Sequence, residues 1–374
     1  MEHRFEYQGR PGRVVFGAGR RAELGAEAER LGLRRVLVVT TPGRADLAAE
    51  TASTLGDRLA GLHPHAVMHV PAEVAARAVD RARELGADGC VAVGGGSAVG
   101  LGKIVARDTG VPLLAVPTTY AGSEATPIWG ITEDGRKRTG HDPRVLPVTV
   151  VYDPELTLSM PVRLAAESGL NALAHAAETL YAPDVSPVTS LVAAGAARSL
   201  AAGLPRVLAD PSSVPARAEV LQGAWLAGWC LASATMSLHH KLCHTLGGTF
   251  GLPHAPTHAN VLAHVLAFNL PAAPVADAAL REALGTDDVP GRVHALVAEL
   301  GAARSLADLG LPADAVDRVV ELATADPYAN PRPVTPEGVR TILAAALVGA
   351  PPAGAAGPAG PDGAVRTSDR GRIA

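Results

Sequence analysis

The side chains best suited to chemistry are histidines gathered in one part of the chain. His239, His240, His244, His254, His258 and His264 are six of its 13 histidines. In "SLHHKLCHTLGG", His240 and His244 share one face of a predicted helix, while His239 points about 100° away. Glycines after His244 end that helix, and Pro253 fixes the approach to His254. An imidazole can bind a metal, hold an anion or transfer a proton near neutral pH, whereas His258 and His264 are equally consistent with packed residues.

A second pair of polar residues lies upstream, in "LNALAHAAETL". Asn171 and His175 are four residues apart in a predicted helix, so both point to the same side. This spacing suits two metal ligands. The amide of Asn171, however, binds a cation more weakly than a carboxylate does, so the pattern leaves open whether a metal is used.

A glycine-rich segment, "VAVGGGSAVGLGK", follows a predicted strand and opens a helix. Backbone N–H groups can approach a ligand there, and the helix start favours an anion, so we predict a phosphate site. Neither the G-x-G-x-x-G nor the P-loop pattern is present, and a tight turn without a ligand is the alternative. The segment "VPTTYAGSEATP" adds hydroxyls at the edge of the sheet where ligands bind. The residues predicted to bind the nucleotide here are Gly94, Gly95, Gly96, Ser97, Thr118, Thr119 and Ser123.

The predicted secondary structure that must position these residues changes once along the chain, from alternating strands and helices to helices alone. Strands are predicted at 34–41, 65–71, 88–97, 111–120 and 146–154, with an amphipathic helix at 72–86. This alternation predicts a mostly parallel, Rossmann-like sheet covered on both faces. Helix follows helix afterwards, so we expect an α/β domain at 1–158, an all-α domain at 159–350 and a cleft between them. Residues 351–374 are rich in Pro and Gly and are predicted to be disordered.

Bulk properties exclude several classes of protein. A chain of 374 residues, 48% hydrophobic, can bury a large core. A net charge of −4 with few aromatic residues gives no support for nucleic-acid binding. No run approaches the roughly 18 uninterrupted apolar residues of a membrane helix, and the polar start is unlike a signal peptide. Cys90, Cys230 and Cys243 form no CxxC pair, which argues against disulfides and thiolate metal sites. We therefore expect a cytoplasmic protein.

Several segments resemble the iron-containing, or group III, alcohol dehydrogenases to about residue 350. They are "GGGSAVGLGK", "PTTYAGSEATPI", "VYDPELT", "GLNALAHAAE" and "HHKLCHTLGGTFGLPHAPTHANVLAHVLAFN". Within the family, "TGHDPRVLP", "PHAPTHA" and "NPRPVT" are most similar to the maleylacetate reductases. The resemblance implies a dehydroquinate synthase-like fold and a homodimer. It also implies NAD(P)H-dependent reduction of the conjugated C=C of maleylacetate, a dicarboxylate, to 3-oxoadipate in the degradation of aromatic compounds.

The resemblance also assigns positions in the site. Metal-dependent members use an Asp and three His as ligands, and the matching positions are Asn171, His175, His240 and His254. His244 matches a histidine beside the substrate. Because the single anionic ligand is replaced by an amide, and Gly100 likewise replaces a common Asp, we expect no catalytic metal. Any metal present would be held by the three histidines.

The expected chemistry follows from a doubly negative substrate. We expect His175, His240 and His254 to become positive by protonation and to receive an enolate and one carboxylate, with Asn171 beside them, while His244 delivers the proton. Tyr328 either closes the pocket or packs in the core, and Lys241 is expected to be a solvated charge. At the end of the first predicted strand, Thr40 takes the position where an acidic residue would bind the adenosine ribose and exclude a 2′-phosphate. NADH and NADPH therefore both remain acceptable.

Two other interpretations remain open. The first is another dehydrogenase of the same fold that reduces an aldehyde or a ketone with a bound metal, or a relative that acts on a different enone acid. The second is a nucleotide-binding or assembly protein without catalytic activity. The histidines and both cofactor loops weigh against the second alternative.

Overall fold

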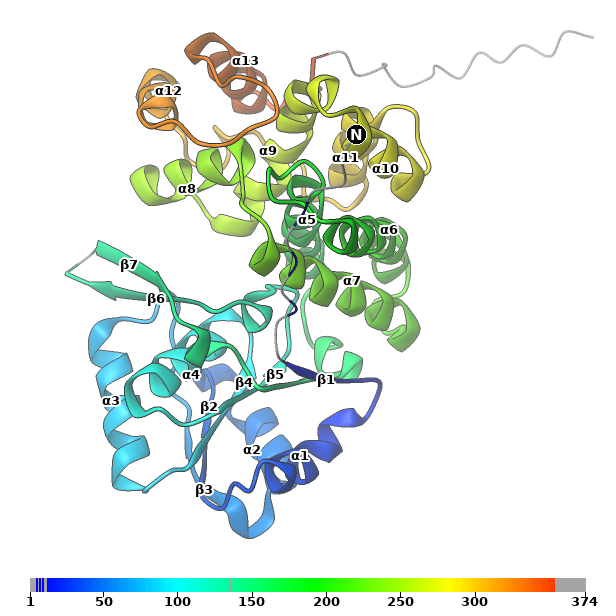
Figure 1. Cartoon of the computed structure of the whole chain (residues 1–374). Coiled ribbons are helices and arrows are strands. Elements are labelled where there is room, and N and C mark those ends of the chain that lie inside the picture. The colour runs from blue at the N-terminus through cyan, green and yellow to red at the C-terminus, as the bar shows by residue number, and fades with distance from the viewer. Residues whose placement is uncertain (1–4, 6, 8, 10–11, 135, 354–374) are drawn as a thin grey trace, which may run out of the picture.

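The computed structural model describes residues 5, 7, 9, 12–134 and 136–353 in two lobes (Figure 1). The residues predicted to form a disordered tail lie outside this part from residue 354 onward. The lower lobe contains a six-stranded sheet and a two-stranded hairpin. The strands are β1 (Arg13–Phe16), β2 (Val36–Val39), β3 (Leu59–His63), β4 (Gly89–Gly94), β5 (Leu113–Pro117), β6 (Ile128–Glu133), β7 (Arg136–His141) and β8 (Thr149–Tyr152).

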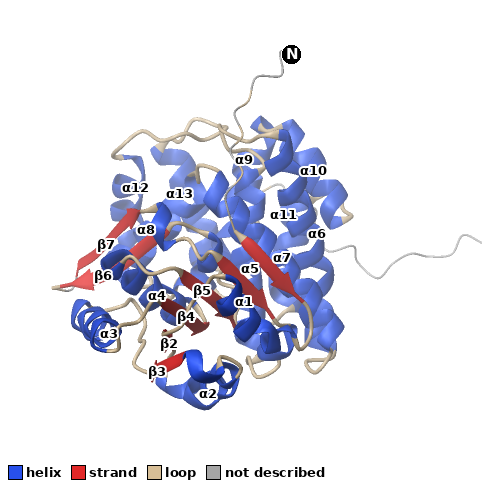
Figure 2. Cartoon of the chain, turned by 60° about the horizontal axis from the view of Figure 1, so that its bottom comes forward, coloured by secondary structure: helices blue, strands red, loops and turns tan. Residues whose placement is uncertain are grey.

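The six-stranded sheet is parallel throughout, which confirms the prediction of a mostly parallel sheet. Its strand order is β1-β8-β5-β4-β2-β3. Its central strands, β2, β4, β5 and β8, are buried on both faces, because helices cover both sides of the sheet. Successive side chains of β2 point to opposite sides. Leu37 and Val39 pack under α3 (Ala72–Glu84) and α4 (Gly96–Thr109). Val36 and Val38 pack under α1 (Leu24–Arg30) and α2 (Ala45–Ser53) on the other face (Figure 2).

One strand prediction is wrong, and four of the described strands, β1, β3, β6 and β7, were not predicted. Residues 65–71 form a loop instead of a strand, because His69 and Val70 have positive φ angles of 65° and 46°. The neighbouring strand is β3, whose half-exposed side chains gave no hydrophobic signal. The hairpin of β6 and β7 is largely exposed and polar, which hid it from an analysis of apolar runs.

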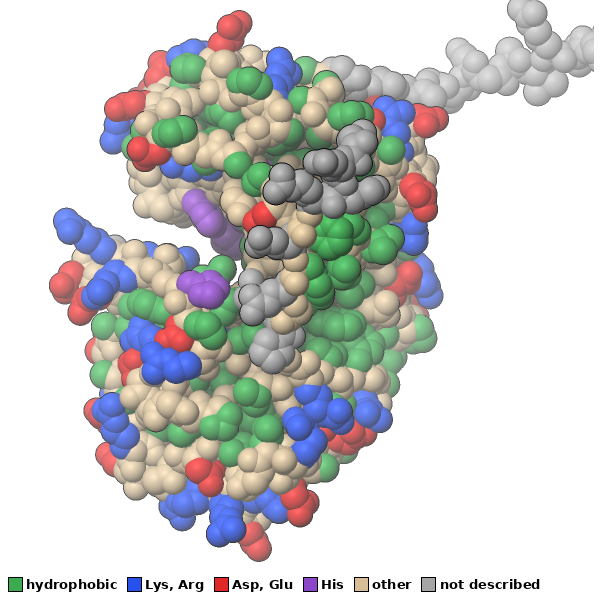
Figure 3. Space-filling model, in the orientation of Figure 1, with side chains coloured by type: hydrophobic (Ala, Val, Ile, Leu, Met, Phe, Trp, Pro, Cys, Tyr) green, Lys and Arg blue, Asp and Glu red, His purple; other side chains and the backbone are tan. Residues whose placement is uncertain are grey.

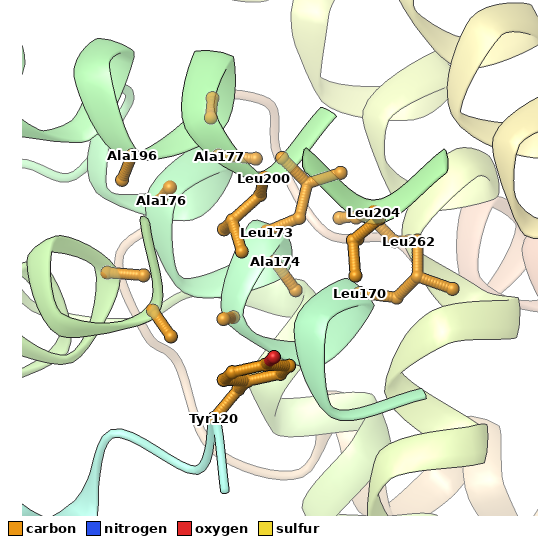
Figure 4. Close-up of a cluster of buried hydrophobic side chains, with 14 of the residues drawn as sticks. Tyr120, Leu170, Leu173, Ala174, Ala176, Ala177, Ala196, Leu200, Leu204 and Leu262 are labelled. Carbon is orange, nitrogen blue, oxygen red and sulfur yellow. The ribbon is translucent and has the colours of Figure 1, made fainter. Parts of the chain in front are cut away.

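The second lobe is helical, and its first helix, α5 (Val162–Thr179), is buried from Ala165 to its end. A core of alanine and leucine side chains surrounds α5 (Figure 4). Tyr120, from the loop after β5, contributes its buried ring to this core, so the lobes share packed side chains. The other helices are α6 (Pro187–Ala209), α7 (Val214–Ser233), α8 (Leu238–Phe250), α9 (His254–Asn269), α10 (Pro274–Leu284), α11 (Val289–Glu299), α12 (Val316–Thr324) and α13 (Pro336–Leu347).

Helix α6 is the one described helix whose length and composition would suffice to cross a membrane. It packs against α5, α7 and α10, and the core helix of a globular protein passes the same test. Ala196, Leu200 and Leu204 bury one side of it in the helical core. The packing therefore accounts for the apolar residues on that side, whereas Val188, Leu191 and Leu208 of the same helix are exposed.

Candidate active site

The glycine-rich segment forms a tight turn from strand to helix. Gly94 ends β4 with a φ of 144°, and Gly95 precedes the first residue of α4. A Cβ atom at Gly95 would lie 2.9 Å from Cγ2 of Thr119, so the turn has no room for a side chain. No side chain caps α4, which leaves its first N–H groups available to an anion. The local geometry suits a phosphate.

The sheet brings a second group of predicted residues to the same edge. β2 and β4 are neighbours in the sheet, but β2 is followed by β3 on one side and β4 by β5 on the other side. The loops after β2 and β4 therefore diverge and leave a crevice between them. Thr40, after β2, has a buried hydroxyl without a hydrogen-bond partner among the described residues. Thr118, after β5, donates its N–H to the Gly94 carbonyl over 3.1 Å. These residues border the crevice where open α/β sheets bind nucleotides.

Ser123 has a different surrounding from the other predicted nucleotide ligands. The ammonium of Lys103, on α4, donates to the Ser123 carbonyl over 2.6 Å and lies 3.2 Å from its hydroxyl. It also donates to Thr126 Oγ1 and to the Ile128 carbonyl, at 3.0 and 2.7 Å. Lys103 is fully buried, and desolvation lowers its pKa to about 7 while the nearby Glu124 carboxylate opposes this shift. Lys103 thus anchors the loop and the base of the hairpin.

Four histidine rings form a buried cluster on the helical side of the site. They are His175 of α5, His239 and His240 of α8 and His258 of α9. The His258 ring centroid lies 4.9 Å from that of His239 and 5.0 Å from that of His240. The centroids of His175 and His240 are 5.1 Å apart. We call these four side chains the histidine floor.

Two further histidines lie at the solvent-exposed margin of the floor. The His254 ring centroid is 4.2 Å from that of His258, and the His244 ring centroid is 5.9 Å from that of His240. Both residues are exposed. The space-filling view shows a cleft between the lobes with histidine side chains on both walls (Figure 3). The predicted residues His175, His240, His244 and His254 therefore belong to one site that opens into this cleft.

A buried carboxylate, which the sequence analysis missed, supports the floor. Glu178 is fully buried on α5, and its Oε2 contacts His240 Nδ1. Its Oε1 accepts hydrogen bonds from the backbone N–H groups of Ser237 and His239, at 3.2 and 2.8 Å. This contact orients the His240 ring so that Nε2, buried and without a partner among the described residues, points away from Glu178.

Glu178, which was missed, and His258, whose role was left open, both had a signal in the sequence. Glu178 follows His175 by three positions and therefore shares the helix face of Asn171 and His175. His258 follows His254 by four positions on α9. His239, expected to point away from the site, reaches the floor through its contact with His258, because a second helix packs on that side of α8.

Burial makes the histidine floor uncharged near neutral pH. Desolvation lowers the pKa of His175, His240 and His258 well below 6.5, and that of His239 to about 4. Repulsion between neighbouring rings adds to the effect. We expected His175, His240 and His254 to become positive by protonation. The lowered pKa values of His175 and His240, and that of His254 at about 4, favour the neutral form of all three rings at neutral pH. The same burial raises the pKa of Glu178.

The positions that match the family's metal ligands do not fit a divalent ion. Asn171 Oδ1 and His175 Nδ1 are buried and unpartnered among the described residues, so two donor atoms are present. In the described chain, however, the triad whose ligand atoms converge within 4.8 Å is His239, His240 and His258, and it does not include His175 or His254. All of these donors are neutral. The three histidines at these positions therefore do not converge on a common point, and the fourth position supplies no anion.

The remaining predicted residues lie around the cluster or away from it. The Tyr328 hydroxyl is buried without a partner among the described residues, and its pKa is raised by burial and by the charge of Glu178, which places it near the floor. Lys241 is half-buried, with Nζ 5.8 Å from the centroid of the Tyr328 ring, instead of fully solvated. His264 is a packed residue, buried near His294 and outside the cluster.

Family models match both lobes of the chain. Residues 11–154 match the model described as iron-containing alcohol dehydrogenase, and residues 165–347 match the C-terminal model of the Fe-containing alcohol dehydrogenase family. The chain belongs to this family. It is therefore an oxidoreductase with the iron-containing alcohol dehydrogenase fold.

Individual members of the family are similar over nearly the whole chain. The maleylacetate reductase of Sphingobium indicum is 51% identical over 93% of this chain and 99% of its own length. Maleylacetate reductase 2 of Cupriavidus pinatubonensis is 51% identical over 92% of this chain and 96% of its own. The crystal structure of maleylacetate reductase from Agrobacterium tumefaciens superimposes with a TM-score of 0.91 at 48% identity, covering 93% of this chain and 99% of that one.

Proposed function

We propose that this protein reduces the conjugated C=C of maleylacetate to give 3-oxoadipate, with NADH or NADPH as the hydride donor. The observation that carries the proposal is the histidine floor, with an amide at position 171, in a chain about half identical to maleylacetate reductases. The glycine-rich turn supports a nucleotide on the opposite side of the cleft. Degradation of aromatic compounds is the corresponding pathway, and a cytoplasmic homodimer remains our prediction.

The cofactor loops explain where a nicotinamide dinucleotide would bind. The uncapped start of α4 suits its pyrophosphate, and Thr40, Thr118 and Thr119 border the same crevice. No acidic side chain occupies positions 40–42 at the end of β2, where one would repel a 2′-phosphate. The proposal therefore includes both NADH and NADPH.

The reaction places negative charge on the ketone oxygen of the substrate. Hydride adds to the alkene carbon remote from the ketone, the alkene electrons move to form an enolate, and a proton then joins the carbon next to the ketone. Preorganised N–H donors stabilise such an oxyanion. His244 reaches the cleft from α8 and is the residue that we propose delivers the proton.

An uncharged imidazole can donate a hydrogen bond to the enolate, because Glu178 fixes which nitrogen of His240 carries the hydrogen. Burial raises the pKa of Glu178 and lowers that of His240, so the pair favours a net neutral state with one proton between Oε2 and Nδ1. In that state His240 carries its other hydrogen on Nε2, which faces the floor. We propose that this N–H is a donor to the enolate oxygen.

We further propose that turnover requires no metal, since the donors at the family's ligand positions neither converge nor carry charge. The test follows NADH and NADPH oxidation with maleylacetate after treatment with a chelator, and then with added Fe²⁺ or Zn²⁺. We expect full activity in the chelator and no increase with either ion. Activity that appears only with metal, or only with simple aldehydes, would contradict the proposal.

Restoring the missing carboxylate sharpens this test. In Asn171→Asp, a buried acid beside His175 and His240 should bind Zn²⁺ much more tightly, because a charge–charge attraction is added. The same charge opposes an enolate, so metal-free turnover should fall about tenfold or more, equivalent to about 1.4 kcal/mol or more of barrier. Equilibrium dialysis with Zn²⁺ measures binding separately from activity. Equal Zn²⁺ affinity in the variant and the parent would refute the role given to the amide.

A further inference from the structure

A doubly negative substrate needs a permanently charged partner, which a group of imidazoles is not. The rings of His175, His239, His240 and His258 are buried and pack against one another. Their N–H groups can contact an enolate, but a second carboxylate in the cleft would remain without a cation. The following inference rests on the proposed function, because it concerns where that carboxylate binds.

The hairpin of β6 and β7 has one face against its own lobe and one face away from it. Residues paired across an antiparallel ribbon point to the same side, and neighbours along a strand alternate. Trp129 and Ile131 pack against the core of α3 and α4, and the Trp129 ring also lies against Gly140. Lys137 pairs with Thr132 and belongs to the opposite face. Its side chain is therefore directed away from the packed lobe.

The outer face of the hairpin borders the cleft. Figures 1 and 3 show the hairpin projecting beneath α8, with Lys and Arg side chains at the open end of the cleft. The stem of Lys137 passes Gly130, where a Cβ atom would lie 3.6 Å from Lys137 Cε. Lys137 thus belongs to the unpacked face of a hairpin that lies beneath α8, the helix that carries His244.

Lys137 is also the cation of the hairpin best placed to accept a ligand. It is exposed, and no described residue forms an ion pair or hydrogen bond with its ammonium. Arg138 lies on the packed side and pairs with Glu133 over 2.9 Å. Arg136 lies on that side as well. Lys241, on the other wall, is half-buried near the Tyr328 ring.

We propose that Lys137 forms a carboxylate-binding subsite on the hairpin, which holds the substrate carboxylate farther from the histidine floor. The base of this arm is fixed, because the Lys103 ammonium binds the carbonyl of Ile128, the first residue of β6. Lys137 thereby selects dianionic enones over monoanionic ones of the same length. A charge-assisted hydrogen bond of this kind changes affinity by roughly ten- to a hundredfold.

The test uses two inert probes that differ in one carboxylate. Adipate, a six-carbon dicarboxylate, and hexanoate are titrated into the full-length enzyme saturated with NADH, and both dissociation constants are measured by calorimetry. We expect the parent protein to bind adipate about tenfold or more tightly than hexanoate. Lys137→Gln should abolish this preference, while Lys137→Arg should retain most of it. Arg136→Gln removes an equal charge from the other face and should leave the preference within about twofold.

Each result decides the inference independently of turnover. If adipate binds the parent no better than hexanoate, or if its preference survives in Lys137→Gln, the subsite does not exist. Loss of the preference in Arg136→Gln as well would show a nonspecific effect of hairpin charge and overturn the inference. Failure to reduce maleylacetate would refute the proposed function while leaving the binding result intact. With maleylacetate, Lys137→Gln should raise KM about tenfold or more and change kcat far less.

Discussion

The histidine floor and the rim of the cleft differ in the charge that they present to an anionic substrate. The floor places four histidine rings and Glu178 almost entirely out of water, and burial keeps the rings neutral. The rim, formed by the hairpin and by exposed histidines, keeps Lys137 solvated and charged. Histidines gathered in one place are therefore not by themselves a positive site, because close packing and desolvation suppress their protonation.

The largest effect that would test this contrast is expected at Glu178. Glu178→Ala would leave the N–H groups of Ser237 and His239 and the Nδ1 of His240 buried without their partner. We expect unfolding free energy to fall by about 3–5 kcal/mol and kcat by roughly a hundredfold. Urea unfolding and steady-state kinetics measure the two effects.

Glu178→Gln is the matched control. Its amide oxygen can accept the two backbone hydrogen bonds, and its NH₂ group can donate to His240 Nδ1, which keeps the hydrogen on Nε2. We therefore expect less than about a tenfold loss of kcat, since the variant imitates the neutral acid. A Gln variant as inactive as the Ala variant would show that the charged carboxylate is required.

Lowering the pH should reduce the free energy of unfolding through the buried histidines before it protonates exposed carboxylates. The pKa of His239 is lowered from 6.5 to about 4, so between these values the unfolded chain binds a proton that the folded chain does not. Stability is therefore lost as pH falls from 6.5 towards 4, by about 2 kcal/mol at pH 5 for one such ring. Asp142, whose pKa is lowered from 3.8, titrates below this window. An unchanged urea midpoint between pH 7 and pH 5 would contradict neutral burial.

A smaller effect is expected where the rim is anchored. Lys103→Met keeps the length of the side chain but removes every donor to the Ser123 and Ile128 carbonyls. We expect a loss of about 2 kcal/mol in unfolding free energy and a few-fold weaker binding of NADH, measured by fluorescence titration. Arg83→Met, which removes an exposed ion pair with Asp80 and an exposed hydrogen bond to the Asp108 carbonyl, should change neither quantity appreciably. Equal effects in both variants would mean that Lys103 anchors nothing.

Much of the fold could be predicted from the sequence, because parallel strands and core helices carry their burial in their own residue patterns. The runs that became β2, β4, β5 and β8 are buried on both faces. The loop at 65–71 was mistaken for a strand, because Ala66 and Val70 are buried by packing without strand pairing. Val70 lies 3.0 Å from where a Cβ of Gly100 would be, a contact between distant segments that local patterns do not contain.

The sequence by itself determined which side chains share a helix face, because a helical repeat fixes the relation of Asn171 to His175 and of His240 to His244. Only the tertiary structure decided which faces meet. Packing of α5, α8 and α9 brought His239 and His258 into the floor and placed Glu178 behind His240. Because burial depends on all of these neighbours at once, the neutrality of the floor and the need for a cation on the facing lobe arise from the folded chain.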